Sequence, residues 1–301
     1  MRIAVTGSTG FVGKAVTGQM MEAGHTVIPV IRPQSRSLYR GEAIRWDPSH
    51  RHIEAQKLES IDAVIHLAGA SIAAHRWTPA YKQIILKSRI EGTEFLSRTI
   101  AGLKTKPRLF LSASAVGFYG SCSTRQMIDE KIPAGKGFLS EVCVAWGKAT
   151  QPMVEAGVRV VPMRFGMVLG KEGALAKMLP IFKLGLGGPL GTGEQVISWV
   201  AVDEIPKMML HVIAQEELTG PVNFVSPFPI TNAGFTKFLA KVLKRPAVFP
   251  VPALAVQILF GEMGRELLLS GATVLPAKLA DSDYRFVYSD LESALRSILK
   301  K

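Results

Sequence analysis

The chain opens with a short β-branched run that leads directly into three glycines, and this feature constrains the fold more than any other. The segment RIAV is followed by Gly7-Ser-Thr-Gly10-Phe-Val-Gly13, after which apolar residues recur at helical spacing. Glycine permits a tight turn and a close approach of the backbone to a ligand. Free N–H groups and the dipole at a helix start attract a pyrophosphate. Glycines between a strand and a helix in this way are typical of a dinucleotide-binding site.

Short apolar runs alternate with longer helical patterns through the first two-thirds of the chain. The predicted strands lie within RIAVTG, TVIPVI, DAVIHLAG, RLFLSAS and VRVVPMRF, and the predicted helices span 11–24, 79–103 and 138–157. Fully apolar strands that alternate with helices are typical of a parallel sheet covered on both faces. We therefore predict an α/β protein with a Rossmann-type, doubly wound parallel sheet.

Two arginines follow the second predicted strand, where an NAD-binding chain usually carries an acid for the ribose 2′-hydroxyl. TVIPVI ends at Arg32, and Arg36 follows. A guanidinium matches a 2′-phosphate bidentately, so the sequence favours NADP(H) over NAD(H); a solvated loop arginine is the alternative for both. His66, inside DAVIHLAG, is interpreted as a core histidine.

The composition changes after residue 170 and predicts a smaller second lobe. KLGLGGPLGTGEQ is expected to be a mobile loop at a substrate site. TNAGFTKFLAKVL is expected to be a helix capped by Thr231 or Asn232, residues 252–270 one apolar helix, and DLESALRSIL an amphipathic helix. We predict an NADP-binding domain over 1–245, with substrate-facing insertions, and a small helical C-terminal domain over 246–301.

Charge and cysteine content bound the remaining possibilities. The net charge is +12, but Lys and Arg are scattered, so we expect a basic surface and no nucleic-acid partner. Two cysteines, Cys122 and Cys143, make a disulfide framework improbable and suit the cytoplasm. No apolar run reaches the length of a membrane span, and we expect neither a membrane partner nor a metal site. The oligomeric state is not readable.

The motifs in this order resemble a known family. TGSTGFVG, HLAG, SASAVGFYG and MRFGMVLG are similar to those of extended short-chain dehydrogenases/reductases of the sugar-nucleotide epimerase type. The segments RWTPAYKQIILKSRIEGT, FLSEVCVAW and ALAKMLPIFKLGLGGPLGTGEQVISWV resemble more closely an atypical subfamily of "epimerase family proteins", in which a domain of unknown function ends the chain. This resemblance covers nearly the whole chain. It implies a Rossmann-type fold, NADP(H) and an unassigned substrate; some relatives carry a cell-division-inhibitor label, and plant relatives are associated with plastid division.

The resemblance also implies a set of cofactor contacts. The glycine loop holds the pyrophosphate, Arg32 meets the 2′-phosphate, and the residues after the third strand line the cofactor. Arg89 and Val168 are further implied contacts, and Lys87 is a possible helper; an exposed helical arginine is the alternative for Arg89. The loop and lining residues are Gly7, Thr9, Gly10, Phe11, Val12, Gly13, Leu67, Ala68 and Gly69.

The segment GFLSEVCVAW lacks the residues that such enzymes use to move a proton. Related enzymes place Tyr-x-x-x-Lys on one helical face, beside a serine. Ser114 stands at the expected strand end, but Phe138 or Leu139 occupies the tyrosine position and Val142 the lysine position. The usual proton relay is therefore absent from its usual place.

Other side chains are candidates to replace that relay. Ser114 and Tyr119 are the predicted catalytic residues, although Tyr119 is usually structural in related enzymes. Glu141 is more often a surface residue and Cys143 a buried, inert thiol. Arg164 is expected to contact a substrate anion or to form an ion pair inside the fold.

Two further residues follow the glycine-rich segment. Trp199 is expected to pack beside the substrate cleft, and Asp203 is expected to cap the next helix.

Two functions remain open from the sequence. The first is an NADP(H)-dependent oxidoreductase or epimerase-like enzyme that acts on an unidentified small carbonyl or sugar-nucleotide-like substrate. The alternative is a non-catalytic NADP(H)-binding regulator, with cell division as its setting. The glycine loop fits both, the missing Tyr–Lys pair favours the regulator, and Ser114 with the glycine-rich loop favours the enzyme.

Overall fold

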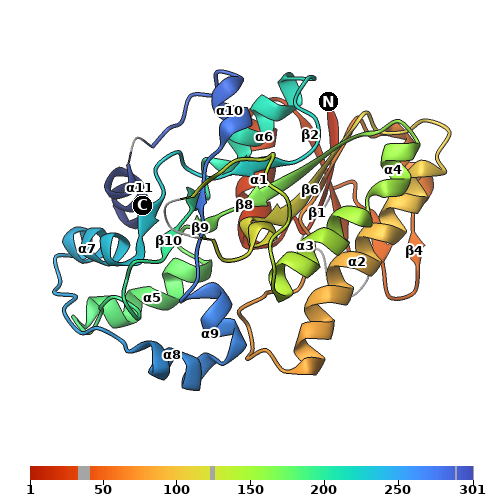
Figure 1. The fold of residues 1–301 in the computed structure, drawn as a ribbon. Helices are drawn as coiled ribbons and strands as arrows, with labels where there is room; N and C mark the ends of the chain where they lie inside the picture. The colour runs from red at the N-terminus through yellow and green to blue at the C-terminus, as the bar shows by residue number, and fades with distance from the viewer. Residues whose placement is uncertain (33–40, 123–125, 289, 301) are drawn as a thin grey trace.

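A large parallel sheet forms the centre of the protein (Figure 1). The computed structural model describes residues 1–32, 41–122, 126–288 and 290–300, so Arg36 lies outside the described residues. Within these ranges the sheet has eight strands in the order β12-β8-β6-β5-β1-β2-β3-β4. They are β1 (Arg2–Thr6), β2 (Thr26–Ile31), β3 (Ile44–Asp47), β4 (His52–Ile53), β5 (Ala63–His66), β6 (Leu109–Ala115), β8 (Arg159–Phe165) and β12 (Val222–Phe224). Within this eight-stranded sheet, β3 and β4 pair antiparallel and all other neighbouring strands pair parallel. The predicted α/β class is confirmed.

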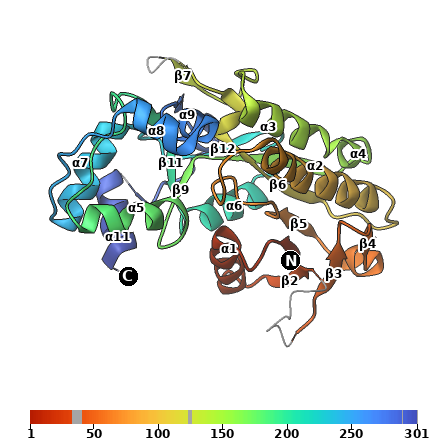
Figure 2. The same ribbon diagram turned by 90° about the horizontal axis from the view of Figure 1, so that it is seen from below.

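Helices cover both faces of this sheet (Figure 2). One face packs against α1 (Phe11–Glu22) and α6 (Ile205–Ala214), and the other against α2 (Pro79–Ala101), α3 (Phe138–Lys148) and α4 (Gln151–Glu155). Successive residues of a strand point to opposite faces. Ile3 and Val5 therefore join the core under α1 and α6, while Ala4 joins the core under α2. Both cores are buried and apolar, as the unbroken apolar strands predict.

The helix predicted over 138–157 is wrong in one respect, because it is divided into α3 and α4. Pro152 lies at the start of α4, and a proline has no N–H to continue a preceding helix. The Thr150 hydroxyl donates to the carbonyl of Gly147 at 2.7 Å, within the turn between the two helices.

The second lobe is built from short strand pairs and helices. The strand pairs are β9 (Met167–Leu169) with β11 (Trp199–Ala201), β10 (Val196–Ile197) with β13 (Ile230–Thr231), and β7 (Met127–Ile128) with β14 (Thr273–Val274). The helices are α5 (Gly173–Lys183), α7 (Asn232–Leu243), α8 (Ala253–Phe260), α9 (Glu262–Leu267), α10 (Ala277–Asp281) and α11 (Leu291–Lys300). The Thr231 hydroxyl accepts the N–H of Gly234, so the predicted cap of α7 is confirmed. Helix α11 packs on α7, and the two share one core. The domain boundary at 245 stays a prediction.

Two expectations for this lobe are wrong, and a third stays a prediction. Trp199 is fully buried in the core of the lobe, where its indole N–H donates to the carbonyl of Phe228, and its place beside a substrate cleft stays a prediction. Glu204, not Asp203, stands at the start of α6, and Asp203 accepts the hydroxyl of Tyr288. The predicted single helix over 252–270 is two helices, because Gly261 between α8 and α9 has a φ of 61°, which a helix cannot continue.

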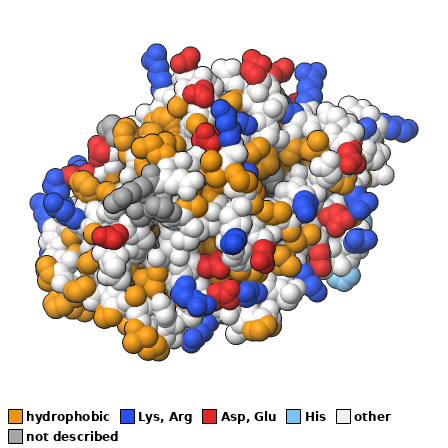
Figure 3. Space-filling view, in the orientation of Figure 1, with side chains coloured by type: hydrophobic (Ala, Val, Ile, Leu, Met, Phe, Trp, Pro, Cys, Tyr) orange, Lys and Arg blue, Asp and Glu red, His pale blue; other side chains and the backbone are white. Residues whose placement is uncertain are grey.

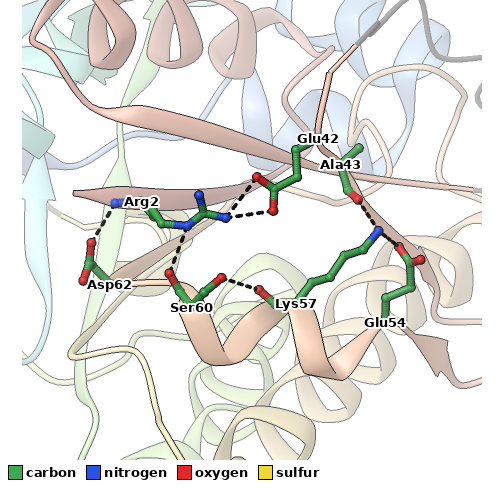
Figure 4. A network of polar contacts seen from close by, with 7 residues as sticks. All are labelled: Arg2, Glu42, Ala43, Glu54, Lys57, Ser60 and Asp62. Carbon is green, nitrogen blue, oxygen red and sulfur yellow. Dashed lines mark hydrogen bonds and ion pairs between the residues drawn. The ribbon is translucent and has the colours of Figure 1, made fainter.

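A polar network lies at the opposite end of the strands from the glycine loop (Figure 4). The backbone N–H of Arg2 donates to Asp62, and its guanidinium donates to Glu42 and to the carbonyl of Ser60, at the end of the 3₁₀ helix η1 (Ala55–Ser60). The ammonium group of Lys57 donates to the carboxylate of Glu54 and to the carbonyl of Ala43. Exposed pairs of this kind contribute little stability each, and they mark the end of the sheet away from the candidate site.

No helix in the described part of the chain is both long enough and apolar enough to cross a membrane.

Candidate functional site

The turn from β1 into α1 has the geometry of a phosphate-binding loop. Gly7 has a φ of 68°, and a Cβ added to Gly13 would lie 2.0 Å from the carbonyl oxygen of Gly7. A side chain would therefore be strained at Gly7 and would clash with the backbone at Gly13. Gly10 precedes α1, no side chain caps the helix, and its first turn carries no acid. The first N–H groups of α1 are thus available for an anion, which the helix dipole also favours.

Thr6 fixes the second wall of this site. Its hydroxyl accepts the backbone N–H groups of Leu67 and Ala68, at 3.1 and 3.2 Å. A Cβ on Gly7 would lie 3.0 Å from the Leu67 carbonyl, so the two strand ends approach closely. Leu67, Ala68 and Gly69 lie beside the glycine loop at the carboxyl ends of β1 and β5, where open α/β sheets bind ligands.

His66 is a core residue, as predicted. It is fully buried, and its ring nitrogens are hydrogen-bonded to the hydroxyls of Thr6 and Thr93 at 2.8 and 2.9 Å. Thr93 also accepts the indole N–H of Trp146. Burial lowers the pKa of His66 to about 4, so the ring is neutral. This chain of hydrogen bonds joins β1, β5, α2 and α3 behind the cofactor-lining residues.

Arg89 places a cation beside Gly69. A Cβ on Gly69 would lie 3.4 Å from the guanidinium carbon of Arg89, which stands over the Trp146 ring at 5.1 Å. Its Nη1 donates to the carbonyl of Ile85, and burial lowers its pKa. Among the described residues Arg89 has no carboxylate at ion-pair distance. A half-buried guanidinium without an acid is suited to an anionic ligand.

The other predicted cofactor residues lie at the same edge of the sheet. Arg32 is exposed directly after β2, and Thr9 is exposed in the glycine loop. Phe11 and Val12 are half-buried in the first turn of α1, and Phe11 packs against Gly170 after β9. Val168 is half-buried in β9. Lys87 is exposed on α2. Arg32, the glycine loop and Leu67 therefore follow the carboxyl ends of the neighbouring parallel strands β2, β1 and β5.

The face of α3 that meets the end of β6 agrees with the expectation at Leu139 and differs from it at Val142. A Cβ on Gly117 would lie 3.1 Å from Leu139, and the Cys143 thiol lies 3.8 Å from the carbonyl of Ala115. Phe138 and Val142 pack in a cluster with Trp77, and Leu139 also contacts this cluster. Leu139 and Cys143, four residues apart, therefore hold the places next to the strand end. Neither is a proton donor of the Tyr–Lys type, and Glu141 is exposed.

Ser114 faces a cavity of about 330 Å³ between α3 and the sheet. Ser112, Cys143 and Arg164 also line the cavity. Ser114 is 9% exposed, and burial raises the thiol pKa of the neighbouring Cys143. Cys143 is therefore a protonated, buried thiol, as expected.

Tyr119 lies at the end of the 3₁₀ helix η2 (Val116–Tyr119) and is buried at 1% exposure. Its hydroxyl donates to the side-chain oxygen of Asn223 at 2.8 Å and accepts from Nη1 of Arg164 at 2.7 Å. Burial raises the pKa of Tyr119. Arg164 stacks on Phe118 at 3.7 Å and has no carboxylate at ion-pair distance among the residues that the structure describes. These contacts favour the structural interpretation of Tyr119.

Two residues of the site have no counterpart among the sequence predictions. Thr6 is a polar residue at the end of an apolar strand, and this position in the sequence could have indicated its role. Glu266, in α9, accepts the N–H groups of Phe138 and Leu139 at the start of α3. It lies far from α3 in the sequence, so no local pattern pointed to it.

Comparison with known proteins gives two family matches and close relatives. The NAD dependent epimerase/dehydratase family matches residues 3–225, and a domain of unknown function, DUF1731, matches residues 251–298. Epimerase family protein MT2273 of Mycobacterium tuberculosis is 38% identical over 296 residues, covering 97% of this chain and 96% of that protein. The solved structure of human epimerase family protein SDR39U1 with NADPH is 31% identical, with a TM-score of 0.87 and full coverage of both chains. The structure of UDP-glucose 4-epimerase from Thermotoga maritima, 21% identical with a TM-score of 0.76, covers 100% of this chain and 98% of that one and shares the fold.

Proposed function

Because the chain belongs to the NAD-dependent epimerase/dehydratase family, we propose that it is an NADP(H)-dependent oxidoreductase or epimerase-like enzyme. Its substrate is a small carbonyl or sugar-nucleotide-like compound. One observation carries the proposal: the glycine turn from Gly7 to Gly13 leads into an uncapped α1, and the Arg89 guanidinium, which has no described carboxylate at ion-pair distance, lies beside Gly69. These groups supply N–H donors and positive charge where a pyrophosphate needs them.

The preference for NADP(H) rests on Arg32. It is exposed at the end of β2, and no described acid lies within ion-pair distance of it. A free guanidinium there suits a 2′-phosphate better than a 2′-hydroxyl. The human relative whose structure resembles this one contains NADPH.

The bound nicotinamide supplies hydride chemistry, and the chain supplies binding and orientation. Thr6 holds the loop of Leu67 and Ala68 in place. Ser114 donates a hydrogen bond to the reacting oxygen of the substrate and polarises it. No Tyr–Lys pair stands on α3, so proton transfer falls to the substrate itself or to water.

The alternative, a non-catalytic NADP(H)-binding regulator, is favoured by a specific observation. The face of α3 beside the end of β6 carries Leu139 and Cys143, and the Tyr119 hydroxyl is committed to Asn223 and Arg164. A site without an available proton donor is expected to bind the dinucleotide and turn over nothing.

Two measurements separate these functions. The first is a fluorescence titration with NADPH and NADH on the wild type, Arg32→Ala and the control Arg108→Ala, which changes an exposed arginine next to β6. We expect tighter NADPH binding, lost selectively in Arg32→Ala; binding of neither dinucleotide would refute the proposal. The second is NADPH oxidation across a panel of carbonyl compounds. Substrate-dependent turnover that Ser114→Ala abolishes supports the enzyme, and tight binding without turnover on any compound supports the regulator.

A further inference from the structure

An apolar surface covers one side of the second lobe, where two distant segments lie side by side. The N–H of Phe249 donates to the carbonyl of Gly187, and the N–H of Val251 donates to that of Pro189. We name residues 181–190 and 244–260 together the α5–α8 surface. Its exposed large apolar side chains are Ile181, Leu184, Leu186, Val248, Phe249, Leu254, Ile258, Leu259 and Phe260.

Helix α8 makes up much of this surface. Its sequence, ALAVQILF, has no charge, and only Val256 is buried. Leu254, Ile258 and Leu259 are 67%, 64% and 64% exposed. Figure 3 shows hydrophobic side chains gathered at the lower left of the molecule, over α5 and α8. Contiguous exposed apolar surface is costly in water and marks an interaction site.

The ionisable side chains within the segments of this surface are all basic; the neighbouring acids Glu262 and Glu292 pair with Lys82 and Lys241. The sequence has no Asp or Glu from Gly173 to Gly193 or from Ala233 to Gly261. The same stretches carry the bases Lys177, Lys183, Lys237, Lys241, Lys244 and Arg245. Lys183, Lys244 and Arg245 are exposed, and none has an acid at ion-pair distance in the described part of the chain. Arg245 donates to the carbonyl of Lys183, which holds these bases at the edge of the apolar side chains.

We propose that the α5–α8 surface docks on an anionic lipid bilayer. The apolar side chains of α8 and of the end of α5 enter the headgroup region, and Lys183, Lys244 and Arg245 meet lipid phosphates. Apolar side chains rimmed by unpaired bases have the chemistry of an interfacial membrane contact. A helix as short as α8, about 12 Å long, lies along the interface and does not cross it. Docking of this kind does not need a membrane-spanning helix. The sequence indicates no membrane partner because none of its apolar runs is long enough for such a helix, and we replace that expectation by this proposal.

Charge argues against a second copy as the occupant. A symmetric dimer through this surface would set the same unpaired bases against one another, and neither segment of the surface carries an acid to pair with them. Anionic lipid supplies the missing charge. The proposal is independent of the proposed function, because none of these side chains belongs to the cofactor site.

The test is flotation of the purified full chain with vesicles of phosphatidylcholine alone and of equal parts phosphatidylcholine and phosphatidylglycerol. Wild type is expected to bind the anionic vesicles about tenfold or more tightly than the neutral ones, and less tightly in high salt. Ile258→Glu with Leu184→Glu, and separately Lys183→Glu with Lys244→Glu, are expected to weaken binding by about tenfold or more. Matched controls are Met21→Glu on α1 and Lys148→Glu on α3, which change exposed residues outside the surface.

NADPH affinity and the thermal midpoint verify that each variant is folded. Failure of wild type to float with anionic vesicles overturns the proposal, as does an equal loss in the control variants. Sedimentation velocity supplies the competing outcome. A wild-type dimer that Ile258→Glu with Leu184→Glu dissociates, without any vesicle binding, would make this surface a contact between copies instead.

Discussion

The carboxylate of Glu266 accepts the backbone N–H of Phe138 at 3.1 Å, and so joins the last part of the chain to the helix that carries the altered catalytic positions. Its second oxygen accepts the N–H of Leu139 at 3.2 Å. Gly137, which precedes α3, has no side chain to cap the helix. Glu262, one turn earlier in α9, pairs with Lys82 of α2. Helix α9 thus fixes the first turns of both α2 and α3 through two carboxylates.

Glu266→Ala is expected to lower the free energy of unfolding by about 2 kcal/mol, because it leaves two helix N–H groups without an acceptor. Glu262→Ala, on the same helix, is expected to cost less than about 1 kcal/mol, since its partly exposed ion pair is weak. Urea unfolding of both variants measures the difference. Equal losses would show that α9 stabilises α3 by packing alone.

Gly13→Ala is expected to abolish NADPH binding, because its Cβ would lie 2.0 Å from the carbonyl oxygen of Gly7 and open the turn. Gly18→Ala, on the same helix, meets nothing within 4 Å and is expected to leave the affinity unchanged. It should also stabilise the fold by about 0.5–1 kcal/mol, as alanine favours the helix. Fluorescence titration and urea unfolding test the pair. Unchanged binding in Gly13→Ala would remove the glycine turn from the cofactor site.

Arg89→Ala is expected to weaken the binding of NADPH and of NADH by similar factors of about ten. The guanidinium lies beside Gly69, and the two dinucleotides would contact this position in the same way. This distinguishes it from Arg32→Ala, which should weaken NADPH alone. Arg98→Ala, on the same helix but paired with Glu94, is the control. Isothermal titration calorimetry gives the affinities, and a loss confined to NADPH would move the 2′-phosphate to Arg89.

Stability is expected to fall as the pH drops from 6.5 to about 4 because of His66. Its pKa is depressed by burial, so in this window the unfolded chain binds a proton that the folded chain does not. The stabilisation is complete above the unfolded pKa, and about 3 kcal/mol is lost by the time the pH reaches the folded pKa. His66→Gln should flatten this part of the profile, while exposed His52→Gln should not. An unchanged slope in His66→Gln would assign the loss to other groups.

Tyr119→Phe is expected to cost about 1–3 kcal/mol of stability, because Asn223 and Arg164 lose a buried partner. NADPH affinity should not change. If a substrate is found, turnover relative to wild type decides the role of this phenol: a rate preserved in folded Tyr119→Phe confirms a structural role, and a rate lost with stability intact would make Tyr119 catalytic after all.

The sequence by itself determined what depends on local order. The strand ending at Thr6, the glycine turn and α1 are contiguous, so backbone sterics fix their geometry wherever the chain goes next. The apolar strands had to be buried on both faces, which decided the parallel sheet. The absence of a Tyr-x-x-x-Lys pair from the segment of α3 was also plain, because residue identity and spacing are read directly from the sequence.

Only the tertiary structure decided what depends on residues far apart in the chain. Packing against Trp77 and Gly117 decided which face of α3 meets the end of β6. It selected Leu139 over Phe138 at the tyrosine position and placed Cys143, not Val142, at the lysine position. The break at Gly261 lay hidden in an apolar run that reads as one helix, because hydrophobicity does not report φ. Glu266 reached the start of α3, and α8 remained exposed, only once both lobes were assembled. Such contacts join residues that are far apart in the sequence. They depend on how all the elements pack together, so no local sequence pattern encodes them.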